Sequence, residues 1–165
     1  MMGAEPVPGC TNPEESAGAL RRFLSDFAWQ GVPVLAYKEE GSRERFAGVT
    51  RQVLFEGDQR LSCQLRYFEI APGGHSTLER HDHLHVVVVV RGAGHALIGH
   101  RVVELALFDV ARIASREWHQ FRATSGEAFG FLCLVAVERD RPERPDAAAI
   151  EELRALPHVA AFIRV

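Results

Sequence analysis

Five consecutive valines, Val86 to Val90, follow directly on a segment rich in histidine. A valine run of this length predicts a buried β-strand rather than a helix, because side chains branched at Cβ fit a pleated sheet better. The preceding segment, Glu79 to His85, carries several side chains able to bind a metal: Glu79, His81, His83 and His85. Imidazole and carboxylate together suit a divalent metal such as Mn, Fe, Ni or Zn. The combination predicts a metal site at the mouth of a β-structure.

Strand patterns also fill most of the chain on either side of this segment. Short apolar or alternating stretches are separated by turns rich in glycine, proline and aspartate, such as Pro72-Gly73-Gly74. They predict strands over Val32–Tyr37, Phe46–Phe55, Leu61–Ile70, Val86–Val90, His95–Ile98, Arg101–Leu107, Val110–Ile113, His119–Arg122 and Ala128–Glu138. Many short strands at even spacing are typical of an all-β sandwich or barrel.

The two ends of the chain have different patterns, which define four regions. Residues 1–13 are rich in proline and predict a flexible tail. Apolar residues recur at helical spacing after Glu14, so an N-terminal helix is expected within residues 14–30. The barrel would occupy residues 31–140. Residues 141–165 are expected to form a C-terminal helical extension, with a helix from Asp146 to Leu156.

Size and composition narrow the classes of function. A chain of 165 residues is expected to form one domain, and its formal net charge of −3 gives no support for binding to nucleic acid or to a membrane. No secretory signal is recognisable at the start. The three cysteines, Cys10, Cys63 and Cys133, show no paired spacing and are expected to be free thiols. The expected location is the cytoplasm.

The histidine segment also resembles the first motif of the cupin family, G-x5-H-x-H-x3-E-x6-G. The register is matched by Gly73, Glu79, His81, His85 and Gly92, although glutamate and histidine have exchanged places at the first and third ligand positions. The resemblance implies a small all-β jelly-roll barrel, usually with one metal. The simpler alternative is a solvated polar loop before a strand.

A second cupin motif, G-x5-P-x-G-x2-H-x3-N, is represented mainly by His119. Its proline, its second glycine and its asparagine are replaced by Ala114, Arg116 and Ala123. The resemblance therefore implies four metal ligands, which are Glu79, His81, His85 and His119.

Strand geometry places one condition on this ligand set. Positions i and i+2 lie about 7 Å apart on one face, whereas positions i and i+4 are roughly 13 Å apart, too far for two ligands of one ion. The chain must therefore bend between His81 and His85, and Asp82-His83 is the expected place. His83 would then lie beside the ligands or face solvent rather than bind the metal.

Three other residues are candidates for the site. Cys133 lies in a predicted strand and is either a thiol in a pocket or a small hydrophobic residue in the core. Gln64 and Arg66 alternate along one strand face, which either binds an anionic substrate or is a polar edge exposed to solvent. Trp118 should point to the face opposite its neighbour His119.

Three histidines and one carboxylate would leave one or two positions open on an octahedral ion, which is typical of a catalytic metal. Longer strings, Arg66 to His81, Trp118 to Phe121 and Gly130 to Cys133, are similar to a narrower group of small cupins in methylthioadenosine salvage. That resemblance implies conversion of 1-methylthio-D-xylulose 5-phosphate to 1-deoxy-D-xylulose 5-phosphate. Manganese is the expected metal and glutathione the co-substrate.

In this interpretation Cys133 is the catalytic candidate, Gln64 and Arg66 bind substrate, and the protein is a homodimer. Two alternatives stay open. One is another metal-dependent cupin enzyme, an isomerase or a dioxygenase acting on a small molecule. The other is a non-catalytic domain that senses a sugar or a metal.

Overall fold

The computed structural model describes residues 20–37 and 46–165. The chain divides into two compact units, Met1–Val32 and Pro33–Val165. All the strands and helices named below belong to the larger unit.

Strands dominate the larger unit, and two short helices follow them. The strands are β1 (Leu35–Ala36), β2 (Ala47–Phe55), β3 (Cys63–His75), β4 (His85–Arg91), β5 (Gly94–Ile98), β6 (Arg101–Leu105), β7 (Val110–Ile113), β8 (His119–Ala123) and β9 (Phe129–Ala136). The helices are α2 (Ala147–Arg154) and α3 (Pro157–Phe162). The prediction of an all-β jelly-roll barrel is confirmed.

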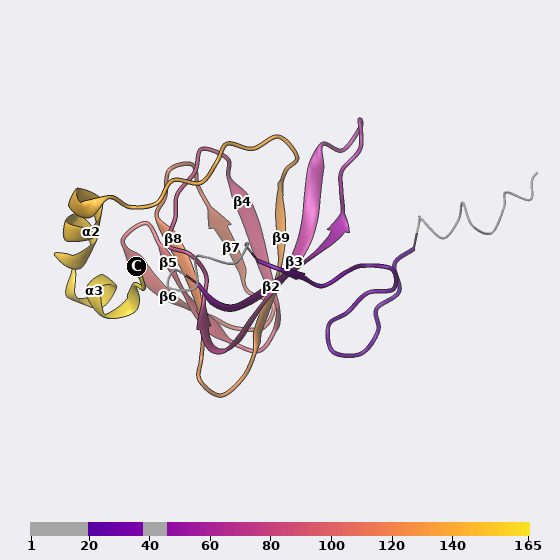
Figure 1. The fold of residues 1–165 in the computed structure, drawn as a ribbon, viewed down its shortest axis with the longest axis horizontal. Coiled ribbons are helices and arrows are strands. Elements are labelled where there is room, and N and C mark those ends of the chain that lie inside the picture. Colours follow the sequence, from indigo (N-terminus) through magenta and orange to yellow (C-terminus); the bar gives the residue numbers. More distant parts are fainter. Residues whose placement is uncertain (1–19, 38–45) are drawn as a thin grey trace, which may run out of the picture. The chain divides into compact units, whose positions relative to one another are not determined.

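One sheet contains all these strands and curls on itself (Figure 1). Its strand order is β6-β5-β8-β3-β9-β4-β7, and β2 pairs with β3 and with β1. Strands β3 and β9 lie antiparallel over eight residue pairs, from Cys63 opposite Ala136 to Ile70 opposite Phe129. Strands far apart in the sequence therefore become neighbours, which brings their side chains into one interior.

The valine run lies within β4, as predicted. Burial alternates along the strand, and Val87 and Val89 are fully enclosed in the barrel core with Ile113, Phe129 and other apolar residues. His85 begins the strand and points to the same side as Val87, because side chains two residues apart share a face. The apolar core thus directs this histidine into the barrel.

The predicted turn at Pro72-Gly73-Gly74 does not end its strand. β3 continues to His75. Its pairing with β9 ends at Ile70, and His75 pairs with Arg122 of β8. A register shift on β2 accommodates the irregularity, since Val49 lies opposite Ile70 whereas Ala47 lies opposite His75. Gly73 adopts a positive φ of 74° there. The glycines therefore carry the strand around a corner of the barrel instead of closing a hairpin.

Gly74→Ala is expected to lower the free energy of unfolding by about 1–3 kcal/mol, as overpacked sites do. A Cβ at this position would collide with the carbonyl oxygen of Ala47 and lie 2.9 Å from that of Ala71, both of which are backbone atoms. Gly126→Ala is the matched control, because a Cβ there meets nothing within 4 Å. Urea unfolding of both variants would measure the difference, and equal stabilities would contradict the close approach.

The C-terminal segment forms two helices where one was predicted. Asp146 caps α2 by accepting a hydrogen bond from the amide of Ala149, and α3 begins at Pro157. Their buried residues form a second apolar cluster with the outer face of the sheet: Leu78, Leu97, Trp118, Leu153, Val159, Phe162 and Ile163. Trp118 lies in this cluster, on the face opposite His119, as predicted. No helix of the described residues is long and apolar enough to cross a membrane.

The helix predicted for residues 14–30 is wrong over its described part. Residues 20–30 instead form a turn closed by a bridge between Phe23 and Trp29. Asp26 and Phe27 have φ near 55° and 53°, which a right-handed helix does not allow. The ring of Phe23 packs edge-on against those of Phe27 and Trp29, so the apolar periodicity reflects an aromatic cluster. Residues 14–19 and the predicted tail, 1–13, lie outside the described residues.

Candidate metal centre

Three imidazoles meet at the mouth of the barrel. His81 follows β3, His85 is the first residue of β4 and His119 the first of β8. One ring nitrogen from each lies within 4.8 Å of the others, and all three residues are buried. The three histidines can therefore hold a metal ion.

The bend required between His81 and His85 is present at Asp82-His83. His83 is not a member of the close group. Its ring stacks on that of His81 at a centroid distance of 3.6 Å, and its Nδ1 lies 2.6 Å from a carboxylate oxygen of Asp140. His83 thus lies beside the three converging histidines, held by Asp140.

The hydrogen bonds of the three rings leave one nitrogen of each for a metal. Nδ1 of His81 faces the carbonyl oxygen of His83 at 2.6 Å, and Nδ1 of His119 faces that of Glu117 at 2.9 Å. Nδ1 of His85 lies 3.4 Å from the sulfur of Cys133. A carbonyl only accepts, so it fixes the proton on Nδ1 and leaves a lone pair on Nε2. Nε2 of His85 is buried with no hydrogen-bond partner among the described residues, which fits a metal ligand.

Burial keeps these imidazoles neutral. It lowers the pKa of His81 to about 4 and that of His85 to about 2, and the neighbouring histidines add to both shifts. Burial also lowers the pKa of His119, although the charge of Glu79 opposes this effect. Neutral rings have the lone pair that a metal requires at neutral pH.

Glu79 lies next to the three histidines but outside their close group. Its backbone pairs with that of His119 through two hydrogen bonds of 3.1 and 2.9 Å, so the two side chains project to one side. Glu79 is buried, and its Oε1 accepts a hydrogen bond of 3.2 Å from the hydroxyl of Tyr37. A carboxyl group is therefore held beside His119.

A cavity of about 290 Å³ opens in front of these residues. Its apolar wall includes Phe68, Phe121 and Phe131, whose rings pack on one another. Its polar wall includes Tyr37, Arg51, Arg66, Glu79, His81, His83, His85, His119, Cys133, Arg139 and Asp140. The site is thus a pocket for a small polar molecule.

Cys133 and Arg66 lie in this cavity, whereas Gln64 does not line it. Cys133 is 2% exposed, and its sulfur accepts a hydrogen bond of 3.3 Å from Nη2 of Arg66. Burial raises the pKa of the Cys133 thiol, and the charge of Arg66 opposes that shift. The amide of Gln64 instead donates to Glu56 at 3.0 Å. The structure therefore groups Cys133 with Arg66 and His85, and it places Gln64 elsewhere.

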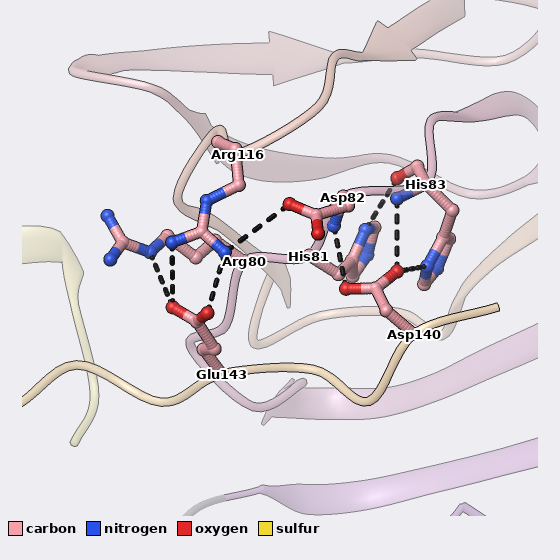
Figure 2. A network of polar contacts seen from close by, with 7 residues as sticks. All are labelled: Arg80, His81, Asp82, His83, Arg116, Asp140 and Glu143. Atoms are coloured by element: carbon pink, nitrogen blue, oxygen red, sulfur yellow. Dashed lines mark hydrogen bonds and ion pairs between the residues drawn. The ribbon is translucent and has the colours of Figure 1, made fainter.

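The segment after β9 crosses over the loop that carries His81 (Figure 2). Asp140 accepts hydrogen bonds from the amides of Asp82 and His83, at 2.7 and 3.1 Å, as well as from the His83 ring. Three residues further along the chain, Glu143 binds the guanidinium groups of Arg80 and Arg116. The backbones of Arg80 and Glu143 also pair. These contacts hold the bend, and through the carbonyl of His83 they orient the His81 ring.

Sequence patterns did not identify Tyr37, Arg51, Arg139 or Asp140 as site residues. Each comes from a strand or loop distant in sequence from the histidine motif. The alternation of side chains along β2 could have indicated Arg51, because it shares a face of the strand with Val49. Asp140 lies in the charged stretch Arg139-Asp140-Arg141, whose composition resembles an ordinary linker.

Comparison with known proteins identifies the family. Residues 66–135 match the model of the cupin domain. A curated protein of Rhodospirillum rubrum, 1-methylthio-D-xylulose 5-phosphate methylsulfurylase, is 54% identical over 144 residues, which cover 87% of this chain and 91% of that protein. The chain belongs to the cupin family.

Two solved cupin structures are similar over nearly their whole length. A cupin 2 conserved barrel domain protein from Rhodopseudomonas palustris is 44% identical, with a TM-score of 0.83, and the match covers 88% of this chain and 99% of that one. A cupin-2 domain protein from Rhodospirillum rubrum is 51% identical, with a TM-score of 0.78 and coverage of 87% and 95%. In this cupin, therefore, the histidines lie in a barrel that the relatives share.

Proposed function

We propose that this cupin is a metal-dependent enzyme that removes the methylthio group from 1-methylthio-D-xylulose 5-phosphate and yields 1-deoxy-D-xylulose 5-phosphate, with glutathione as the thiol. The reaction belongs to methylthioadenosine salvage. The observation that carries the proposal is the 54% identity, over 87% of the chain, to a protein named for this activity. The converging histidines beside a buried thiol support it.

The proposed ligands are Glu79, His81, His85 and His119, and manganese is the proposed metal. Nδ1 of each ring is already engaged, so Nε2 is the atom available to bind. Glu79, whose carboxylate accepts from Tyr37, would have to turn toward the histidines to complete the set. A divalent ion held there supplies positive charge that stabilises the oxygens of an enolate or enediolate.

The overall reaction balances with one thiol. A thiolate attacks the sulfur of the methylthio group, an S–S bond forms, and the bond between that sulfur and C1 breaks. The electron pair of the broken bond stays on C1, where it is conjugated with the C2 carbonyl. C1 then takes up one proton, which matches the proton that the thiol lost. Carbon is reduced and sulfur is oxidised, so the products are the deoxyketose phosphate and a mixed disulfide of glutathione and methanethiol.

Cys133 is the proposed thiol of the protein in this reaction. Arg66 donates to its sulfur, and Nδ1 of His85 lies 3.4 Å from the same atom. With Nε2 of His85 bound to a metal, Nδ1 would carry the proton and donate it to the sulfur. Two donors on one sulfur favour the thiolate and oppose the effect of burial. Cys133 would take the methylthio group first, and glutathione would then release it as the mixed disulfide. Arg66 is proposed to bind the substrate as well as to stabilise this thiolate.

Incubation of the manganese-loaded protein with 1-methylthio-D-xylulose 5-phosphate and glutathione tests the activity. We expect 1-deoxy-D-xylulose 5-phosphate and the mixed disulfide in equal amounts, measured by mass spectrometry. Omission of thiol should stop turnover. If fully metallated protein leaves the substrate unchanged, the activity is rejected, and a cupin isomerase, dioxygenase or binding domain would take its place.

We also propose that the protein acts in the cytoplasm as a homodimer. Leu107, Phe108 and Val110 lie exposed around the turn before β7, where a second copy could cover them. Light scattering after size exclusion should give twice the chain mass of 18.3 kDa. A monomer at micromolar concentration would contradict the dimer.

Asp140→Ala is expected to weaken metal binding about tenfold, because groups that hydrogen-bond to the ligands and orient them typically contribute 10–100-fold to metal affinity. The variant removes three hydrogen bonds from the bend that orients His81. Asp58→Ala is the control, since Asp58 accepts from two backbone amides in a turn elsewhere. Titration with manganese would compare the two affinities. Equal affinities would show that Asp140 does not position the site.

A further inference from the structure

Three arginines face the proposed substrate cavity: Arg51, Arg66 and Arg139. Arg51 lies on β2 opposite Phe68, and Arg66 lies on β3 two residues before Phe68. In a sheet, the side chains of two paired residues share a face, and so do those of residues two apart in one strand. Arg51 and Arg66 are therefore diagonal neighbours that point into the barrel. Arg139 joins them from the segment after β9, where its Nη1 donates to the carbonyl of Ala136 at 2.7 Å.

No carboxylate in the described part of the chain forms an ion pair with these three arginines. Nε of Arg51 and Nε of Arg66 are buried, and each is without a hydrogen-bond acceptor among the described residues. Burying a guanidinium group in this way is costly unless an anion binds there.

Two carboxylates line the same cavity, but both are engaged elsewhere. Asp140 accepts from Asp82 and His83. Glu79 accepts from Tyr37 and lies beside His119. Like charges at this end of the cavity repel, and after the larger effect of burial the charges of Arg66 and Arg51 lower the pKa of Arg139. A bound anion would relieve that repulsion.

We propose that Arg51, Arg66 and Arg139 form a subsite for the phosphate monoester of the substrate. This inference rests on the proposed function, and it assigns the end of the cavity that holds the phosphate. A phosphate dianion offers three terminal oxygens to guanidinium forks, and two of these arginines have buried donors still to satisfy. A carboxylate has only two oxygens and would leave donors unsatisfied.

The subsite also orients the substrate. Arg66 contacts Cys133, and Cys133 contacts the ring of His85. A molecule whose phosphate binds the arginines therefore extends past the sulfur of Cys133 toward the histidines. Its carbonyl end would lie at the proposed metal, and its methylthio group within reach of the thiol.

Calorimetry on the metal-loaded protein tests the subsite, with D-xylulose 5-phosphate, D-xylulose and inorganic phosphate as ligands. Wild type should bind the phosphate ester at least about tenfold more tightly than the free sugar, since one charged hydrogen bond is worth that much. Arg51→Gln and Arg139→Gln should each reduce ester affinity roughly tenfold to a hundredfold and leave binding of the free sugar unchanged. Arg51→Lys should retain part of the affinity. Arg101→Gln, at an exposed position on β6, is the matched control.

Kinetics separate this inference from the proposed activity. If wild type turns over substrate, the Arg51 and Arg139 variants should show a raised KM with kcat nearly unchanged. If those variants bind and react like wild type, the subsite is wrong while the activity stands. If wild type binds the ester through these arginines but no turnover occurs, the activity fails and the subsite stands. If wild type does not prefer the ester to the free sugar, the subsite is rejected whether or not the protein is active.

Discussion

His81→Ala and His119→Ala are each expected to bind manganese at least about a hundredfold more weakly than wild type. Loss of a ligand should exceed the 10–100-fold loss of metal affinity that follows when a group orienting a ligand is removed. Both rings are buried and have Nδ1 committed to a carbonyl, so each would contribute its Nε2 to the ion. Metal analysis after dialysis should find one equivalent in wild type and almost none in these variants.

His83→Ala is the discriminating control for that experiment. His83 contributes its backbone carbonyl to the orientation of His81, and alanine keeps that atom. The variant should therefore retain most of its metal, as should His100→Ala at an exposed turn. If His81→Ala and His119→Ala kept a full equivalent, or if His83→Ala were the variant that lost it, the proposed ligand set would be wrong.

Cys133→Ala is expected to lower kcat on the order of a thousandfold or more, as removal of a nucleophile does, with metal content unchanged. The thiol would be the atom that receives the methylthio group, and alanine cannot replace it. A single turnover of wild type without external thiol should leave Cys133 heavier by a methylthio group. Mass spectrometry of the intact protein and of its peptides would detect the adduct.

Cys63→Ala is the matched control, since Cys63 is a free cysteine that does not line the cavity. It should turn over like wild type. If Cys133→Ala also turned over normally, glutathione would attack the substrate directly, and Cys133 would serve only to pack the core and to orient His85.

The sequence predicted the structure best where a single physical constraint decided the backbone conformation. The valine run of β4 predicted a buried strand, because apolar side chains branched at Cβ favour a strand over a helix. The bend at Asp82-His83 followed from the distance limit on ligands of one ion, applied to the ligand set that the cupin resemblance implies. The helix expected around Phe23 and Phe27 failed, because apolar spacing cannot distinguish a helix from an aromatic cluster around a turn. The corner at Pro72-Gly73-Gly74 was interpreted as a turn, because glycine is common both in tight turns and at corners within a strand.

The candidate site was predictable only where its residues lie close together in sequence. Glu79, His81 and His85 belong to one motif, and His119 followed from a second. Arg51, Arg139 and Asp140 reach the cavity through the pairing of β2 with β3 and through the segment after β9. Such positions depend on tertiary contacts, which spacing along the chain does not encode. Gln64 shares strand parity with Arg66, but the cavity ends before it.

The strand order has a kinetic consequence. β3 pairs with β9, whose partner residues lie 59 to 73 positions later, and β8 lies between β3 and β5. Pairings of such long range close slowly, and they leave strand edges uncovered until the late partner arrives. During synthesis the edge of β3 would therefore stay unpaired until Phe129–Ala136 has left the ribosome. The site needs β4 and β8 in place, and the Asp140 contacts come later still, so metal capture belongs among the last events of folding.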